Sequence, residues 1–217
     1  MVSFLILVHH LEKYSKKDIN HGKTPKSIYT LCCAIREAFC LSYNIRKENN
    51  VFLYFQDSHI LIKLVGRKLR YLGPDERSQT ILVNKALKLV NPKTNKKDTG
   101  WIPSTPGFFI RKFPSNDSFL RYFETIVGEI PLLVTDKPFK KVDSSIEEIQ
   151  LNSITRYESS FFIIPAGKID DLNQFIQKMY DFIPSMKNIN LPQLHFSFER
   201  ILFINYKKDK KSQTIQQ

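Results

Sequence analysis

The chain opens with an uninterrupted apolar run at residues 2–8 (VSFLILV), which ends at His9 and His10. A run of this length without alternating polar residues is typical of a strand buried on both faces, as in the middle of a parallel sheet. It is too short to cross a membrane, and no basic leader precedes it as in a signal peptide. We therefore expect a central parallel strand and no membrane partner.

Strand-like and helix-like segments alternate along the rest of the chain. Apolar side chains spaced three or four residues apart predict helices at 27–42, at 74–90, from 116 or 118 onward, and at 169–182. Short apolar runs predict strands at 51–55, 60–64, 108–111, 132–134, 161–164 and 189–191. Residues 196–206 fit either a strand or a helix. The alternation predicts an α/β fold with a mostly parallel sheet flanked by helices.

The remaining segments are polar and predict loops. Residues 10–26 and 135–160 lack a clear pattern, 91–100 form an exposed insertion, and 207–217 form a flexible tail. Ser27 is the expected cap of the first helix. The expected inward side chains of the second helix are Ile81, Leu82, Ala86 and Leu89. No repeat or low-complexity linker divides the chain, so we expect a single domain over 1–217.

The charge balance is the most informative part of the composition. Thirty-three Lys and Arg residues against 21 Asp and Glu residues leave a formal charge of +12. Such an excess favours a polyanionic partner, because counterion release and electrostatic steering both strengthen its binding. A lysine-rich surface that only keeps the protein soluble is the alternative. Charge alone does not separate RNA from DNA or from an anionic membrane surface.

Cysteines and histidines indicate neither a disulfide framework nor a metal site. Cys32, Cys33 and Cys40 are an odd number of cysteines without a C-x-x-C pair. This pattern fits a reducing, cytoplasmic compartment and small buried side chains. The five histidines show no ligand spacing, so we expect no metal.

Three short stretches are more specific than the composition. They are residues 41–46 (LSYNIR), 72–78 (LGPDERS) and 100–111 (GWIPSTPGFFIR). Their order and spacing resemble the archaeal tRNA pseudouridine N1-methyltransferases, which belong to the trefoil-knot (SPOUT) methyltransferases and act on the T-loop pseudouridine, nucleotide 54. The resemblance is close over residues 28–112 and weak over 130–210.

The resemblance implies a SPOUT-like fold with a C-terminal trefoil knot, an RNA-facing half at 1–128 and a cofactor half at 129–210. It also implies a cytoplasmic homodimer that uses S-adenosylmethionine to methylate N1 of pseudouridine in tRNA, without a metal. That N1 is a free, weakly acidic N–H, because the base is joined to ribose through carbon. An enzyme must align this nitrogen with the methyl group and stabilise the negative charge that develops on the ring.

Asp75 and Arg77 are the candidate catalytic residues. One turn supplies a carboxylate that can accept a proton and a guanidinium that can face the charged ring. The same Pro-Asp-Glu-Arg turn occurs in the family. The alternative is a helix start, in which Pro74 suits the first turn and acidic side chains suit the positive end of the helix dipole.

The candidate RNA-binding residues are Arg46, Arg67, Lys68, Arg70 and Arg111. Three of them precede Tyr71, and cations beside an aromatic ring suit phosphate contacts and base stacking in loop RNA. An ordinary solvated face is the alternative for that run, and a favourable charge at a helix end is the alternative for Arg46. Arg111 follows the Ser-Thr-Pro-Gly turn of the third stretch, and the resemblance gives both a substrate-side role. A simple tight turn is the alternative there.

The resemblance places the cofactor among three loops of the second half. The candidate residues are Leu133, Gly167, Ile189, Asn190, Leu191, Pro192, Gln193, Leu194 and Arg200. The sequence departs from the family pattern at residues 165–166 and at residue 200. Pro165 and Ala166 replace a Gly-Asp pair, and the proline removes an N–H and stiffens its loop. Arg200 stands at the position of a cysteine and adds bulk and positive charge near a sulfonium.

Two functions follow from these observations. The first is the S-adenosylmethionine-dependent methyltransferase acting on the T-loop pseudouridine of tRNA. The second is a divergent relative that binds structured RNA without catalysis, as the substitutions at Pro165 and Arg200 suggest. Cofactor binding and methyl gain on tRNA discriminate between them.

Overall fold

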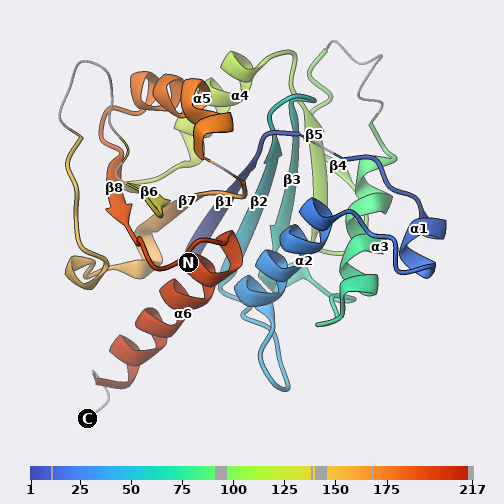
Figure 1. The fold of residues 1–217 in the computed structure, drawn as a ribbon, viewed down its shortest axis with the longest axis horizontal. Helices are drawn as coiled ribbons and strands as arrows, with labels where there is room; N and C mark the ends of the chain where they lie inside the picture. Colours follow the sequence, from blue (N-terminus) through green and yellow to red (C-terminus); the bar gives the residue numbers. More distant parts are fainter. Residues whose placement is uncertain (11, 91–96, 138, 140–145, 168, 215–217) are drawn as a thin grey trace.

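One eight-stranded sheet extends through the protein in the order β4-β5-β3-β2-β1-β7-β6-β8 (Figure 1). The computed structural model describes residues 1–10, 12–90, 97–137, 139, 146–167 and 169–214. The strands are β1 (Val2–Val8), β2 (Asn49–Phe55), β3 (Ile60–Val65), β4 (Ile102–Pro103), β5 (Phe108–Lys112), β6 (Ile130–Thr135), β7 (Ser160–Pro165) and β8 (Lys187–Asn190).

The five strands β2, β1, β7, β6 and β8 pair in parallel, whereas β3, β5 and β4 extend the sheet with antiparallel pairs. The predicted α/β fold with a mostly parallel sheet is therefore confirmed. β1 lies inside the parallel part, as its apolar run predicts. Phe4 and Ile6 pack into one hydrophobic layer, Leu5 and Leu7 pack into the other, and all four are fully buried.

Helices cover both faces of this sheet. They are α1 (Lys16–Asn20), α2 (Lys26–Phe39), α3 (Glu76–Leu87), α4 (Asn116–Ile126), α5 (Ile169–Phe182) and α6 (Ser197–Thr214), with short 3-10 turns η1 (Gly66–Lys68), η2 (Leu151–Ser153) and η3 (Tyr157–Ser159). The apolar sides of α2, α3 and α6 pack on one face, and those of α4 and α5 pack on the other (Figure 1). The helices predicted from apolar spacing are thus present.

Three local predictions are wrong. The expected loop at 10–26 contains α1, which begins with a capping box. The Asp18 amide donates to the Ser15 hydroxyl, and the Ser15 amide donates to the Asp18 carboxylate. The hydroxyl of Ser27 does not cap α2, which begins at Lys26, and it donates to the Glu12 carboxylate instead. Leu89 is 44% exposed rather than inward, because α3 ends two residues earlier.

The ambiguous segment 196–206 belongs to helix α6, which continues to Thr214. The prediction of a flexible tail is therefore wrong for residues 207–214. The ammonium of Lys211 donates to the carbonyl oxygens of Asn152 and Ile154, so this end of the helix is held against the segment before β7. Residues 91–96 and 215–217, which belong to the predicted insertion and tail, lie outside the described residues. The threading expected for the C-terminal segment stays a prediction.

The pairing of the strands defines two edges of the sheet, one at each end of the parallel strands. At the carboxyl edge lie the ends of the parallel strands and the segments that follow β6, β7 and β8. At the amino edge lies the loop 40–48 before β2. Because β3 and β5 are antiparallel, the segment 66–75 after β3 and the turn 104–107 before β5 lie there too. The seven residues of β1 separate the two edges by about 20 Å.

Candidate functional site

The first two characteristic stretches meet at the amino edge. They enclose a cavity of about 320 Å³ that is lined by Cys40, Leu41, Ser42, Tyr43, Asn44, Ile45, Leu72 and Pro74. The loop is closed by main-chain bonds, in which the Leu41 amide donates to the Asn44 carbonyl at 2.8 Å and the Arg46 amide donates to the Phe39 carbonyl at 2.7 Å. The ring of Tyr43 is fully exposed at the cavity rim.

The third stretch joins the same edge through Gly107. Its φ is +89°, and a Cβ added there would lie 2.7 Å from the Leu69 nitrogen and 2.8 Å from the Leu69 Cα. The turn is fixed by the Phe108 amide, which donates to the Thr105 carbonyl at 2.8 Å. Only glycine lets the Ser-Thr-Pro-Gly turn approach segment 66–70 this closely. Stretches separated along the chain therefore form one cluster, a proximity that their spacing alone does not show.

Asp75 is the N-cap of α3, as the helix-start alternative predicts. One of its carboxylate oxygens accepts the Ser78 amide at 2.7 Å, and this hydrogen bond lowers the pKa of Asp75. Arg77, one residue into the helix, is exposed and donates to the side-chain oxygen of Asn20 at 3.3 and 3.4 Å. Both residues follow Pro74 at the cavity rim. Their catalytic role stays a prediction.

Two candidate RNA-binding arginines are already paired with carboxylates. Arg111 binds Asp98 at 2.9 and 2.5 Å, and its guanidinium lies 4.6 Å from the ring centres of Phe113 and Tyr122. Arg46 binds Asp209 of α6 at 2.8 and 2.6 Å. The other three, Arg67, Lys68 and Arg70, are exposed on the segment after β3.

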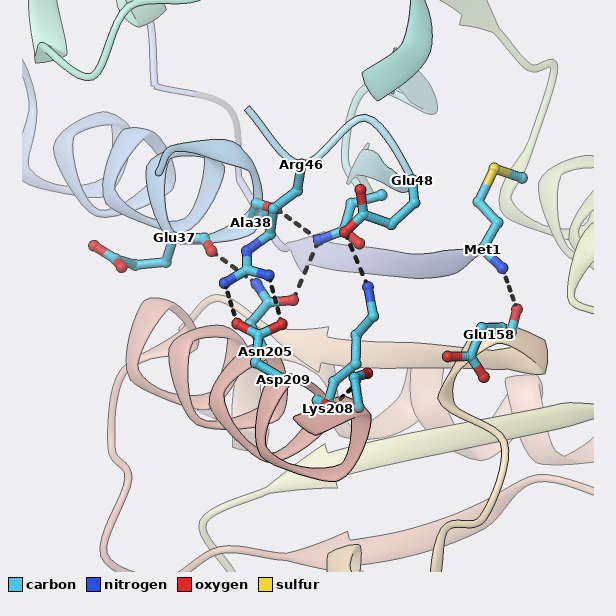
Figure 2. Close-up of polar contacts among 11 residues, drawn as sticks. Met1, Glu37, Ala38, Arg46, Glu48, Glu158, Asn205, Lys208 and Asp209 are labelled. Atoms are coloured by element: carbon cyan, nitrogen blue, oxygen red, sulfur yellow. Dashed lines mark hydrogen bonds and ion pairs between the residues drawn. The ribbon is translucent and has the colours of Figure 1, made fainter. Parts of the chain in front are cut away.

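The Arg46 pair belongs to a polar clamp between α6 and the loop before β2. Figure 2 shows Arg46 facing Asp209 and Glu48 facing Lys208. Asn205 adds a bond to the Glu37 carbonyl at 2.8 Å, at the end of α2. The clamp fixes the C-terminal helix against the amino edge. Sequence reasoning missed it because the partners lie about 160 residues apart, which leaves no local signal.

The carboxyl edge holds a cavity of about 580 Å³ beside the end of β8. Its lining residues are Glu148, Ile149, Gln150, Leu151, Asn152, Asn190, Leu191, Phe203 and Lys207. The side-chain oxygen of Asn190 is buried and has no hydrogen-bond partner among the described residues. Two candidate cofactor residues, Asn190 and Leu191, thus line one cavity of nucleoside size.

The other cofactor candidates do not line this cavity. Leu133 and Ile189 are buried in the core, Pro192 and Gln193 are exposed, Leu194 is half-buried, and Gly167 is exposed with open space around it. The Ala166 amide donates to the Leu7 carbonyl at 2.8 Å, so it is used within the sheet. A ligand role for this group stays a prediction.

Arg200 is buried in a cage of oxygen atoms and is only 2% exposed. Its guanidinium donates to the carbonyls of Leu194 at 2.9 Å, His195 at 3.1 Å and Val134 at 3.4 Å. It also lies 3.3 Å from the carboxylate of Asp136. Burial lowers the pKa of Arg200, although the nearby carboxylate opposes this effect. The side chain ties the ends of β6 and β8 to α6.

The groups that line the cavity beside β8 suit an uncharged base. The Arg200 guanidinium, by contrast, is poorly suited to contact a positively charged ligand. The unpartnered Asn190 oxygen can accept a hydrogen bond from an exocyclic amino group, and Leu191 and Phe203 can contact a base. The guanidinium of Arg200 is already engaged, and its charge would repel a sulfonium.

No group of three or more His, Cys, Asp or Glu side chains suited to a metal ion occurs within the described ranges. In that same part of the chain, no helix combines the length and the apolar character needed to cross a bilayer. The fold and its edges thus define a basic α/β protein with a cavity of about 580 Å³ at one edge and a cluster of characteristic stretches at the other.

Three curated proteins show what this chain is similar to, and each is named tRNA (pseudouridine(54)-N(1))-methyltransferase. The protein of Methanosarcina mazei is 35% identical over 152 residues, which cover 66% of this chain and 67% of the relative. Those of Methanocaldococcus jannaschii and Methanosarcina acetivorans are 33% and 37% identical over 51% and 55% of this chain.

This chain belongs to the tRNA (pseudouridine(54)-N(1))-methyltransferase family. The alignments span 57% of the Methanocaldococcus relative and 56% of the Methanosarcina acetivorans relative, so a little more than half of each is matched. No family model matches the chain.

Proposed function

We propose that the protein is an S-adenosylmethionine-dependent methyltransferase that modifies N1 of the T-loop pseudouridine in tRNA. The observation that carries this proposal is the proximity of the first two stretches and the Ser-Thr-Pro-Gly turn of the third at the amino edge of the sheet, whereas Arg111 at the end of the third stretch lies at the opposite edge. Membership of a family whose curated proteins carry this activity in their name supports it. The charge of +12 suits a tRNA substrate.

Within this proposal, S-adenosylmethionine supplies the methyl group when it is bound. Asn190 would accept a hydrogen bond from the donor's adenine, and Leu191 and Phe203 would exclude water from the faces of that base. Arg77 stabilises the negative charge that develops on the pseudouridine ring. The N1 proton passes to solvent water, because Asp75, whose pKa is lowered by the Ser78 amide, is a weak proton acceptor. Asp75 instead caps α3 and so positions Arg77.

A methylation assay tests the function. We expect the purified protein to transfer one methyl group to tRNA that carries pseudouridine at position 54, and none to the same tRNA with uridine there, because uridine has no free N1–H. Mass spectrometry of the digested tRNA identifies the product. Salt-dependent tRNA binding without methyl gain, with folded protein and saturating donor, would favour the non-catalytic alternative.

The variant Asn190→Leu tests the donor cavity. Removal of the acceptor should weaken donor binding about tenfold, the equivalent of one lost hydrogen bond, and tRNA affinity should stay unchanged. Calorimetric titration with S-adenosylmethionine measures the effect. Asn173→Leu is the matched control, since Asn173 is an exposed asparagine on α5, outside the cavity and on the opposite face of the sheet. Equal donor affinity in the wild type and both variants would remove Asn190 from the site.

We also propose that the protein acts as a homodimer. Reacting atoms must approach to about 3–3.5 Å, whereas the amino and carboxyl edges of one subunit lie about 20 Å apart. A homodimer in which the amino edge of each copy faces the carboxyl edge of its partner completes both sites. Leu202 and Tyr206, one turn apart on α6 and 53% and 54% exposed, provide an apolar surface for this contact.

The variant Leu202→Glu should convert the dimer to a monomer and abolish methyl transfer, because a carboxylate would be buried in the interface. Sedimentation analysis gives the mass, and the same samples are assayed for methylation. Leu89→Glu is the control, since Leu89 is a comparably exposed leucine at the end of α3. A monomeric wild-type protein with full activity would contradict the dimer.

A further inference from the structure

A cationic pocket with aromatic walls lies on the sheet away from both edge cavities. It measures about 250 Å³ and is lined by Lys63 and Val65 of β3, Lys68 of η1, Trp101 and Phe109. We call these five residues the aromatic shelf. They lie on the sheet face that α4 and α5 cover elsewhere. Trp101 makes an edge-to-face contact with Tyr122 of α4, with 6.1 Å between the ring centres. Trp101 and Phe109 remain partly exposed there.

Both lysines of the shelf lie over aromatic rings. The Lys63 ammonium is 5.7 Å from the ring centre of Trp101 and 5.4 Å from that of Phe52, and the Lys68 ammonium is 5.5 Å from the ring centre of Phe109. In the described part of the chain neither ammonium has a carboxylate partner. Burial, and then the charge of Lys68, lower the pKa of Lys63. An anion beside these two cations would relieve that repulsion.

The surroundings of the shelf extend the positive charge toward the amino edge. Arg67 and Arg70 are exposed on either side of Lys68. The ring of Tyr71 is 69% exposed, and the chain then reaches Pro74 at the rim of the motif cavity. A single-stranded nucleic acid bound at the shelf can therefore contact these cations and the Tyr71 ring as it continues to the cluster of characteristic stretches.

We propose that the aromatic shelf binds a single-stranded segment of RNA, with a base stacked on Trp101 and Phe109 and the adjacent phosphate between Lys63 and Lys68. Aromatic faces combined with cations are the chemistry that unpaired nucleotides require, because every base has a face to stack and a phosphate beside it. A double helix offers the shelf phosphates but no exposed base face. The inference deepens the proposed function, and the identity of the RNA as tRNA rests on it.

The test uses Trp101 as its own reporter, since it is the chain's only tryptophan. A single-stranded RNA of about seven nucleotides should quench its fluorescence in a saturable way at about 0.1 M salt. The double variant Lys63→Gln and Lys68→Gln should bind this RNA about tenfold more weakly. Lys68→Gln alone, at an exposed position, should weaken binding about threefold and serves if the double variant unfolds.

The matched control is the double variant Lys85→Gln and Lys88→Gln, which removes the same charge from exposed positions at the end of α3, a helix on the opposite face. It should bind RNA within about twofold of the wild type. Equal losses in the two double variants would show non-specific attraction and overturn the proposal. Quenching by duplex RNA, phosphatidylserine vesicles or polyglutamate that matches or exceeds quenching by the single strand would also overturn it.

The outcome is separable from that of the proposed function, because the titration needs no methyl transfer. Methylation of tRNA without quenching by single-stranded RNA would reject the shelf and leave the enzyme assignment intact. Quenching that depends on Lys63 and Lys68, without methylation of tRNA, would support the shelf and reject the enzyme assignment.

Discussion

Replacement of Arg200 by Met should lower the free energy of unfolding by about 3 kcal/mol and the midpoint of thermal unfolding by about 6–12 °C. Methionine fills a similar volume, so the loss comes from the polar cage rather than from a cavity. The carbonyls of Val134, Leu194 and His195 would lose a charged donor. Asp136, 25% exposed, would keep its charge without its partner.

The appropriate comparison is Arg121→Met, because Arg121 is an exposed arginine on α4. That variant should change the free energy of unfolding by no more than about 0.5 kcal/mol. Urea unfolding of both variants gives the free energy of unfolding. An unchanged dependence of that free energy on urea concentration shows that the variants differ from the wild type in stability and not in the surface exposed on unfolding. If Arg200→Met unfolds at the wild-type midpoint, the buried cage is not a stabilising element.

The same cage shows what sequence reasoning could and could not reach. Arg200 stands where the resemblance implies a cysteine, so the sequence marks this position as unusual. The sequence does not reveal Asp136 or the three carbonyls as partners, because these lie in β6, directly after it, and in the segment after β8. The guanidinium is bonded within the protein, and its role toward a cofactor stays a prediction.

Local patterns predicted the elements whose burial is regular. The run of β1 and the apolar spacing of α5 are examples, since each buries the side that its pattern marks. Helix α1 was not predicted because it is short and polar, although Ser15 and Asp18 have the spacing of a capping box. The last turns of α6 were not predicted because the residues that hold them, such as Glu48 for Lys208, lie far away in the sequence.

The amino-edge cluster illustrates the same limit for the site. The three characteristic stretches were recognisable as motifs, yet their proximity depends on the antiparallel turn from β2 to β3 and on the return through β5. Gly66 shows how close that packing is, since a Cβ there would lie 2.5 Å from the Asn49 carbonyl and 2.7 Å from the Arg46 carbonyl. Periodicity along one segment carries no information about such contacts between segments.

Gly107 provides the second large effect. Gly107→Ala should lower the free energy of unfolding by about 3 kcal/mol, of which about 1–2 kcal/mol is backbone strain at a φ of +89° and the rest is overlap with Leu69. The main chain of Leu69 cannot rotate away as a side chain would. The Ser-Thr-Pro-Gly turn must therefore move from segment 66–70, and we expect tRNA methylation to fall together with stability.

Gly100→Ala is the control that separates strain from overlap, since Gly100 has a φ of +64° and no atom within 4 Å of an added Cβ. It should lower the free energy of unfolding by only about 1–2 kcal/mol. The difference between the two variants measures the close approach of the turn to Leu69. Equal midpoints in urea for both variants would mean that the turn does not pack there, and the proposed cluster of three stretches would lose its third member.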